Sequence, residues 1–284
     1  MPSVTAKTIK AGVIGWPVEH SLSPRLHGYW LDTYGIDGVY LPLPVAPPNI
    51  EDAIRALPKL GFVGANVTVP HKEAAFWTVD GMSDAARAIG AVNTIVCDED
   101  GELYGDNTDA FGFIENIRAG APDWAADKAP AVVLGAGGAA RAVIAALIDA
   151  GTPEIRLANR TRERAAELEA HFGKAITVVS WDDRNGAMDG AGTLVNTTSL
   201  GMTGNPPLEV DLAGLVPHAV VNDIVYAPLE TPLLLDAKAR GLTAVDGLGM
   251  LLHQARPGFE AWFGMRPEVD DALRAHVLAG RDRG

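Results

Sequence analysis

A lysine and an aspartate stand at two predicted helix starts, where their charges point to chemistry. Lys72 closes the stretch Asn66-Val-Thr68-Val-Pro70-His71-Lys72, which ends a predicted strand and begins a helix. The helix dipole disfavours a cation in the first turn, so Lys72 is either an ordinary surface residue or a proton carrier. Asp109 closes Gly105-Asp-Asn-Thr-Asp109 before another helix. It is therefore either a helix cap or a partner for such a lysine.

Two further stretches carry hydroxyl and amide side chains beside predicted helix or strand starts. Ser21-Leu-Ser23-Pro24 precedes a helix, and its two hydroxyls can cap that helix or bind a carboxylate beside its N-terminus. Gly90-Ala-Val-Asn93-Thr94 places an amide where a turn becomes a strand. The residues alone leave capping and ligand binding both open.

A glycine-rich turn predicts a dinucleotide site. The stretch Gly135-Ala-Gly-Gly-Ala-Ala140 follows the apolar run 131–134 and opens an alanine-rich helix over 139–149. Strand, G-x-G-x-x-G/A turn and helix together form the fingerprint of dinucleotide binding. In this pattern the glycines allow a tight turn and a close approach of the pyrophosphate, and the helix N-terminus offers free N–H groups.

The residues after the next strand indicate which dinucleotide is bound. An NAD site usually has an acidic residue there, which holds the ribose 2′-hydroxyl. This chain has Asn159-Arg160-Thr161-Arg-Glu-Arg164 instead. Arginines at this place suit a 2′-phosphate, so the sequence predicts NADP. The alternative is a helix start with ordinary surface arginines, but that does not account for the missing carboxylate.

Short apolar runs and helical patterns alternate along the chain, which predicts largely parallel α/β sheets. Strands are expected at 10–15, 39–44, 62–67, 92–97, 131–134, 154–158, 176–179, 193–196, 220–225 and 243–245. Helices are expected at 24–34, 49–57, 71–78, 110–118 and 139–149, and again beyond 247. The loop 119–130 is a candidate domain boundary. Because the polar motifs fall on both sides of the middle block, we expect a discontinuous first domain; two sequential domains are the alternative.

Composition excludes several classes of protein. The 284 residues suit two domains, and the net charge of −13 argues against nucleic acid as a partner. The single cysteine, Cys97, can form neither an internal disulfide nor a cysteine metal cluster. The histidines lack metal-ligand spacing, so no metal is expected. Without a secretory signal or an apolar run of about 18 residues, a cytoplasmic protein with no membrane partner is expected.

Taken together, these stretches resemble the shikimate dehydrogenase family, in order along nearly the whole chain. To the motifs above the family pattern adds Asn107-Thr108-Asp109-x-x-Gly112, Asn196-Thr-Thr-Ser-Leu-Gly201-Met202, Asp223-x-x-Tyr226-x-Pro228 and Gly247-Leu-Gly249-Met250-Leu-x-x-Gln254. One small departure is Thr197, where alanine is commoner in the family.

The resemblance implies a two-domain α/β enzyme. A parallel-sheet substrate domain would comprise residues 1–108 plus 247–284, and a Rossmann-type doubly wound NADP domain would comprise 109–246, with a cleft between them. The implied activity is the reversible NADPH-dependent reduction of 3-dehydroshikimate to shikimate, on the route to chorismate and aromatic amino acids. The implied partner is this small molecule, and a homodimer is possible.

The resemblance also implies roles for residues. Lys72 and Asp109 form the catalytic pair. The substrate-binding set is Ser21, Ser23, Thr68, Lys72, Asn93, Asp109, Tyr226 and Gln254. The cofactor-binding set is Asp84, Gly135, Ala136, Gly137, Gly138, Ala139, Asn159, Arg160, Thr161, Arg164, Ile224 and Gly247. A helix-surface carboxylate is the simpler interpretation of Asp84.

Two other functions fit parts of the pattern. A quinate/shikimate dehydrogenase would act on a ring with an added tertiary hydroxyl and often prefers NAD; the arginines and the two serines favour shikimate. A catalytically silent NADP-binding sensor could keep the fold, but Lys72 and Asp109 argue against it. The sequence gives neither the oligomeric state, nor the degree of preference for NADP, nor the activity on quinate, nor regulation by pathway products.

Overall fold

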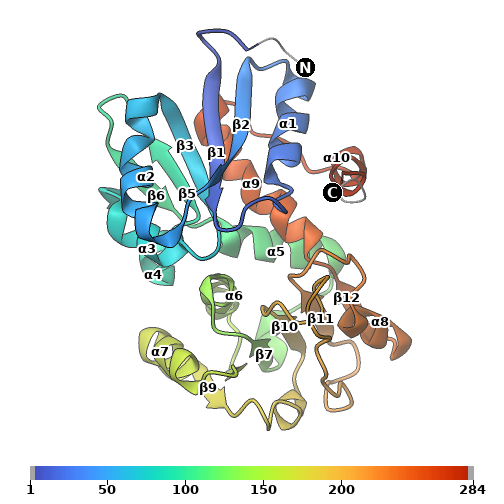
Figure 1. The fold of residues 1–284 in the computed structure, drawn as a ribbon. Helices are drawn as coiled ribbons and strands as arrows, with labels where there is room; N and C mark the ends of the chain where they lie inside the picture. The colour runs from blue at the N-terminus through green and yellow to red at the C-terminus, as the bar shows by residue number, and fades with distance from the viewer. Residues whose placement is uncertain (1–3, 281–284) are drawn as a thin grey trace. The chain divides into compact units, whose positions relative to one another are not determined.

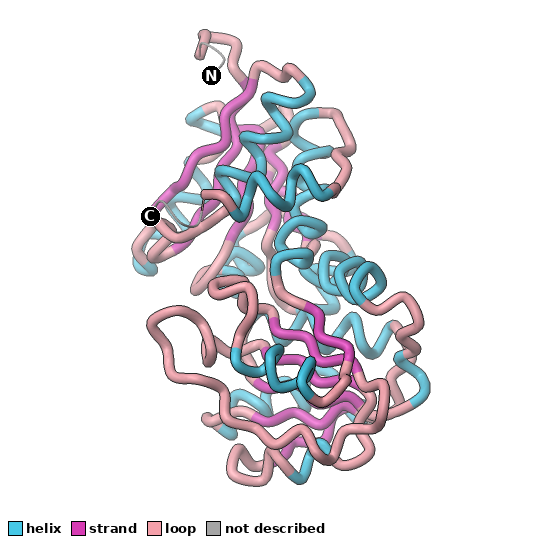
Figure 2. The backbone as a smooth tube through the Cα atoms, turned by 90° about the vertical axis from the view of Figure 1, so that its right-hand side faces the viewer, coloured by secondary structure: helices cyan, strands magenta, loops and turns pink. Residues whose placement is uncertain are grey.

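The computed structural model describes residues 4–280 of the chain. By its internal contacts the chain divides into two compact units, Met1–Asp109 with Leu251–Gly284, and Ala110–Met250 (Figures 1 and 2). Each unit contains its own six-stranded sheet. Asp109 thus lies in the first unit and residues 247–250 in the second, whereas the boundaries predicted from the sequence assigned these residues the other way round.

The sheet of the first unit is mostly parallel, with one antiparallel strand inserted. Its strands stand in the order β2-β1-β3-β5-β6-β4. β1 is parallel to β2 and β3, β5 is antiparallel to β3 and β6, and β4 is parallel to β6. The strands are β1 (Ile9–Gly15), β2 (Gly38–Pro44), β3 (Phe62–Val67), β4 (Gly81–Met82), β5 (Thr94–Cys97) and β6 (Leu103–Asp106).

Helices cover both faces of this sheet. The apolar cluster on one face joins strand residues such as Ile14 and Ile95 to three short helices, α2 (Ile50–Ala56), α3 (Lys72–Thr78) and α4 (Asp84–Ile89). On the other face lie α1 (Ser23–Tyr34) and α9 (Leu248–Phe263), joined by the contact between the Trp30 and Phe259 rings at 5.2 Å. The last helix, α10 (Asp271–Leu278), packs against α1.

The position of α9 on this sheet is fixed by one close approach. The Trp262 indole Nε1 donates to the Ile95 carbonyl at 3.0 Å. A Cβ at Gly64 would lie 2.2 Å from the same nitrogen. Only glycine therefore leaves room for this indole, and the anchored helix carries Gln254 toward the sheet.

The second unit is a doubly wound parallel sheet. Its order is β12-β11-β10-β7-β8-β9, with every pair parallel. This is the strand order of dinucleotide-binding folds. The strands are β7 (Ala131–Leu134), β8 (Ile155–Ala158), β9 (Ile176–Val179), β10 (Thr193–Asn196), β11 (Val220–Asp223) and β12 (Thr243–Val245).

Both faces of this second sheet are buried, which explains why β7 is apolar throughout. Val133 belongs to the cluster formed with α5 (Asp109–Gly120), α6 (Gly138–Asp149) and α7 (Arg162–Phe172). Its neighbours Val132 and Leu134 belong to the opposite cluster, which includes α8 (Pro232–Ala239). Short 3-10 segments lie at Pro47–Asn49, Pro58–Leu60, Ala126–Lys128, Gly173–Ala175 and Gly186–Met188.

The main differences from the predicted strands lie in the first unit, and the helices α4, α7 and α8 had no predicted range. The strand predicted over 92–97 begins only at Thr94 and runs antiparallel to β3. β6 and the short β4 were not predicted. β6 contains Gly105 and Asp106, residue types that are depleted in strands. It is placed by a tight turn in which the Asp98 carboxylate accepts the backbone N–H groups of Asp100 and Glu102.

Candidate active site

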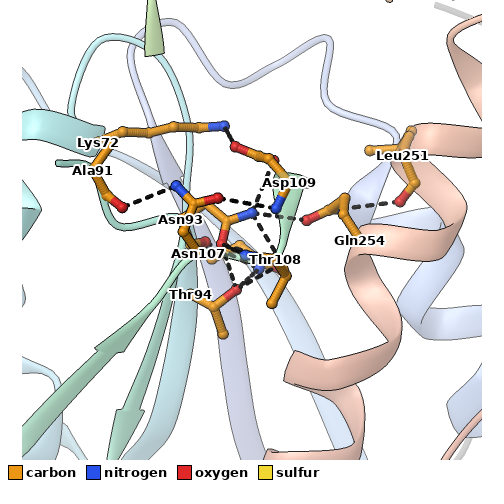
Figure 3. Close-up of polar contacts among 10 residues, drawn as sticks. Lys72, Ala91, Asn93, Thr94, Asn107, Thr108, Asp109, Leu251 and Gln254 are labelled. Atoms are coloured by element: carbon orange, nitrogen blue, oxygen red, sulfur yellow. Dashed lines mark hydrogen bonds and ion pairs between the residues drawn. The ribbon is translucent and has the colours of Figure 1, made fainter. Parts of the chain in front are cut away.

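The structure brings Lys72 and Asp109 together in the first unit (Figure 3). Lys72 is the first residue of α3, and Asp109 is the first residue of α5. The Lys72 Nζ lies 2.5 Å from the Asp109 Oδ2, and the two side chains are only 14% and 7% exposed. Asp109 is thus not a simple helix cap, because its carboxylate forms an ion pair with Lys72.

Asn93 holds the other oxygen of this carboxylate. Its Nδ2 donates to the Asp109 Oδ1 at 2.9 Å and contacts the Gln254 Oε1 at 3.3 Å. Its Oδ1 accepts the Thr108 backbone N–H at 2.9 Å. The amide is therefore oriented from both ends, with its donor toward the carboxylate, and the expected group of Lys72, Asn93, Asp109 and Gln254 is assembled (Figure 3).

Backbone contacts anchor the pair on one segment, residues 91–93. The Lys72 carbonyl accepts the Val92 N–H at 2.9 Å. The Asn107 amide donates to the Ala91 carbonyl at 2.9 Å and accepts the Asp109 N–H at 3.1 Å. Asn107 was quoted as part of the family pattern without a role, and here it joins the start of α5 to this segment.

The mixed sheet explains why residues from distant stretches share one edge. Ser21 and Ser23 follow β1, and Thr68 follows β3, which is parallel to it. Because β5 is antiparallel to β3, its beginning, with Asn93, lies at the carboxyl end of β3, where Asn66 pairs with Thr94. β6 reverses direction again, so that its end at Asp106 also pairs with Thr94. Residues 107–109 therefore arrive at the same edge.

The two serines do not act as side-chain caps of α1. The N-cap position is Leu22, which has no side-chain capping bond. Within the segment the Ser21 hydroxyl accepts the Ser23 N–H at 3.3 Å. Ser23 is buried and Ser21 is half-buried. The interpretation as caps is therefore wrong for the N-cap position, while a carboxylate-binding role stays a prediction.

Asn66 was quoted in the motif that ends at Lys72, but the sequence reasoning gave it no role. Asn66 is buried in β3, donates to the Asn93 carbonyl at 3.2 Å and to the Thr94 hydroxyl at 3.1 Å, and accepts the Tyr40 hydroxyl at 2.6 Å. A polar side chain in a fully buried strand needs hydrogen-bond partners. The amide in the apolar run 62–67 was therefore the signal that could have revealed it.

In the second unit the glycine-rich turn joins β7 to α6 through a glycine with a positive φ and an open glycine N-cap. Gly135 has a φ of +107°, and a Cβ there would lie 2.6 Å from the Thr197 Oγ1. Gly137 is the N-cap of α6 and has no atom within 4 Å of a Cβ built on it. Gly138 and Ala139 begin the helix. The backbone N–H groups are therefore open to an anion at this helix N-terminus.

The segment between β8 and α7 presents its arginines to solvent. Asn159 donates to the Thr161 carbonyl at 2.7 Å, which shapes the turn. Arg160, Thr161 and Arg164 are exposed, and within residues 4–280 neither arginine forms an ion pair. Both guanidinium groups are therefore available for a phosphate.

The ends of β11 and β12 meet near the same edge of the second sheet. A Cβ at Gly247 would lie 2.2 Å from the Ile224 carbonyl oxygen, so these two backbones touch.

Tyr226 is partly exposed, and burial raises the pKa of its hydroxyl. Asp84, in the first unit, is an exposed residue at the start of α4. Across residues 4–280 no cluster of His, Cys, Asp and Glu could hold a metal ion.

Asp223 closes β11 as a fully buried carboxyl group. Its Oδ1 accepts the Asn196 amide at 2.9 Å and the Val225 N–H at 3.1 Å, and its Oδ2 accepts the Thr231 hydroxyl at 2.7 Å. Burial raises the pKa of Asp223 to about 6, more than these hydrogen bonds lower it. Asp223 thus ties the segments after β10 and β11 together.

Family models match three regions of the chain. They are described as shikimate dehydrogenase substrate binding domain over residues 13–95, shikimate/quinate 5-dehydrogenase over 121–201, and shikimate 5′-dehydrogenase C-terminal domain over 247–275. A shikimate dehydrogenase (NADP(+)) of Paramagnetospirillum magneticum is 63% identical over 276 residues, 97% of this chain and 100% of that protein. The chain belongs to the shikimate dehydrogenase family.

Solved structures with two different enzyme names share this fold. A shikimate dehydrogenase in complex with NADP⁺ is 35% identical with a TM-score of 0.88, covering 98% of this chain and 97% of that one. A quinate dehydrogenase from Corynebacterium glutamicum in complex with NAD is 32% identical, also with a TM-score of 0.88, covering 96% and 99%. Within the shikimate dehydrogenase family the fold therefore does not separate the two activities, and individual residues must.

Asp223→Asn should remove one pH dependence of stability. The folded protein binds a proton at Asp223 below about pH 6, whereas the unfolded chain does so only below its ordinary pKa of 3.8. The folded state holds more protons in this window, so the free energy of unfolding falls as pH rises from about 4 to 6. Asparagine stays neutral and keeps the Oδ1 contacts. Urea unfolding at pH 4.5, 5.5 and 6.5 should show that the free energy of unfolding decreases less with pH in the variant than in the wild type. The difference between the two decreases should reach up to roughly 3 kcal/mol.

Asp149→Asn is the control, because this exposed carboxylate ends α6 in the same unit. It should retain the wild-type slope. An Asp223→Asn variant with an unchanged slope would contradict the assignment of this titration to Asp223.

Proposed function

We propose that the protein is an NADP-dependent shikimate dehydrogenase, which reversibly reduces 3-dehydroshikimate to shikimate on the route to chorismate and the aromatic amino acids. The observation that carries the proposal is the Lys72–Asp109 pair, held by Asn93 in a chain that belongs to this family. Such a pair can move a proton at an oxygen atom while a nicotinamide cofactor moves the hydride.

Lys72 is the proposed proton carrier. Reducing a ketone to an alcohol adds a hydride to carbon and a proton to oxygen, and bound NADPH supplies the hydride. The Lys72 ammonium group donates the proton to the ketone oxygen, and in the reverse direction the amine takes it from the alcohol. Asp109 sets the position of the Lys72 Nζ through their 2.5 Å contact. It also accepts a hydrogen bond from a substrate hydroxyl.

The remaining polar side chains are proposed to bind the substrate. Ser21 and Ser23 donate to its carboxylate, beside the start of α1. Hydroxyl and amide groups suit a polyhydroxylated ring, because sites built for hydroxyls penalise ligands that leave them unpaired. The ring-binding residues are Thr68, Asn93, Asp109 and Gln254, and Tyr226 is proposed near the carboxylate.

NADP is the proposed cofactor, and the second unit fits it. The turn over 135–139 would hold the pyrophosphate, and the segment 159–164 would hold the 2′-phosphate through its arginines. The touching backbones of Ile224 and Gly247 are proposed to face the nicotinamide. Asp84 remains a prediction, because its exposure at the start of α4 also fits an ordinary surface carboxylate.

Two broader expectations remain proposals. A cytoplasmic location fits an enzyme that consumes NADPH; no helix within residues 4–280 is long and apolar enough to cross a membrane. The second proposal is a homodimer, which light scattering would test.

The wild-type protein should oxidise shikimate with NADP more efficiently than shikimate with NAD, quinate with NADP or quinate with NAD. The two arginines after β8 and the two serines favour this pair. Steady-state kcat/KM for the four combinations gives the answer. Quinate with NAD as the best pair would favour the quinate dehydrogenase alternative, and no turnover with any pair would favour a silent NADP-binding protein.

Lys72→Ala should lower kcat by about 10²–10⁴, the usual range for loss of a general acid–base group. KM for shikimate should change much less, because an interaction made mainly in the transition state appears in kcat. Stability should also fall, since Asp109 is left as a buried charge without its partner, so a cooperative urea unfolding transition serves to verify folding. Lys59→Ala, at an exposed lysine, is the control. Near wild-type turnover in folded Lys72→Ala would exclude Lys72 as the proton carrier.

Replacing Arg160 and Arg164 together by alanine should raise KM for NADP by about 10²- to 10⁴-fold, because two charged hydrogen bonds to a phosphate are lost. KM for NAD should change little. Arg162→Ala is the matched control, since it removes an exposed arginine from the same helix start. Equal effects of the double variant on both cofactors would contradict the phosphate-binding role.

A further inference from the structure

Tyr40 lies under the polar network of the first unit, although it belongs to a different strand. It stands in β2 opposite Ala11 of β1, which in turn pairs with Gly64 of β3. The small side chain of Ala11 lets the buried tyrosine cross β1 to reach Asn66, while the Trp262 indole fills the space at Gly64. Its hydroxyl donates to the Asn66 Oδ1 at 2.6 Å.

The ring of Tyr40 is held in place by aromatic packing. The His27 ring of α1 stacks on it with centroids 3.9 Å apart and planes 2° from parallel. Burial lowers the pKa of His27 to about 3, so the imidazole is neutral above that pH and packs as an aromatic ring. Trp262 of α9 lies 6.0 Å from the Tyr40 ring. The packed rings therefore restrict the conformation of the Tyr40 side chain and hold its hydroxyl against Asn66.

From Tyr40 the hydrogen bonds run in one direction toward Asp109. The Asn66 Nδ2 donates to the Thr94 hydroxyl at 3.1 Å, and that hydroxyl donates to the Asn93 Oδ1 at 3.0 Å. The Asn93 Nδ2 donates to the Asp109 Oδ1 at 2.9 Å. Along this line each group accepts from the group before it and donates to the next, which strengthens the bonds cooperatively, while Thr108 and Gln254 also contact Asn93.

We propose that Tyr40 is a positioning residue for the dehydrogenase reaction, acting through Asn66 and Thr94 on Asn93 and the Lys72–Asp109 pair. This inference rests on the proposed function. Its basis is geometric. The Tyr40 hydroxyl donates a hydrogen bond to Asn66, and the series of hydrogen bonds that follows ends on the Asp109 carboxylate, which pairs with Lys72.

The hydroxyl fixes which way the Asn66 amide points. With the Tyr40 donor on its oxygen, the amide must present its nitrogen to the Asn93 carbonyl and the Thr94 hydroxyl. Without that donor, the buried Asn66 oxygen loses its 2.6 Å hydrogen bond and keeps only the His27 ring beside it, which costs free energy. A flipped amide would then place oxygen against the Asn93 carbonyl at 3.2 Å. Either response disturbs Asn93, and with it the position of Asp109.

Ser23 lies at the other end of this chain. Its side chain lowers the pKa of the Tyr40 phenol less than burial raises it. Tyr40 therefore stays protonated, as a donor to Asn66 must. The buried hydroxyl thus lies between the serine proposed to bind the substrate carboxylate and the pair proposed to move the proton.

Tyr40→Phe tests the proposal, because it removes the hydroxyl and keeps the ring on His27. Measured on wild-type enzyme and variant, kcat should fall about 5- to 50-fold, as expected for an unpaired buried acceptor. KM for NADP should stay within about twofold. Tyr34→Phe is the matched control, because the Tyr34 hydroxyl accepts the Glu268 N–H at 3.2 Å in the same unit, away from Asp109. It should leave kcat unchanged even if the melting temperature falls.

Thr94→Val supplies the second variant, because it removes the next donor of the chain with little change in shape. We expect a fall in kcat here too, and the double variant Tyr40→Phe/Thr94→Val should be no more than about twofold slower than the slower single variant. Two results would overturn the proposal: kcat of folded Tyr40→Phe within twofold of wild type, or a double variant in which the two losses multiply. Absence of wild-type turnover would instead count against the proposed function itself.

Discussion

The contact between Lys72 and Asp109 is the interaction on which the arrangement of the first unit depends. Two charges withdrawn from water are costly unless their remaining hydrogen-bonding positions are satisfied. Asn93 satisfies the second carboxylate oxygen, and Asn107 and Val92 fix the backbones that carry the pair. The surrounding polar side chains thus make a buried ion pair possible and leave it at the edge of the sheet, where a substrate can be bound.

An antiparallel strand within a mostly parallel sheet makes this convergence possible. A purely parallel arrangement would send the beginning of β5 to the opposite edge, together with Asn93. Reversing β5, and reversing direction again at β6, brings Asn93 and residues 107–109 to the carboxyl ends of β1 and β3. The second unit has no such reversal, and its fully parallel sheet leaves the glycine-rich turn after β7 at the edge typical of dinucleotide binding.

The sequence predicted the strands of the second unit more completely than those of the first, for physical reasons. Strands buried on both faces, such as 131–134, appear as apolar runs, and the glycines of the turn are required by backbone geometry. β6 was missed because Gly105 and Asp106 are poor strand formers. Lys72, Asn93 and Asp109 could be singled out by type and place. The role of Asn66 and its link to Tyr40 could not, because it depends on the register of three strands and on the small side chain of Ala11.

The discontinuous first unit has a consequence for the order of synthesis. Domains generally form as units while the chain emerges from the ribosome, N-terminal parts first. Here a nascent chain that stops before Leu251 already contains Lys72, Asn93 and Asp109, but lacks Gln254 and the indole that fills the space above Gly64. The second unit is continuous, so it can fold before the part of α9 that belongs to the first unit has been synthesised. The unit encoded first is thus the one completed last.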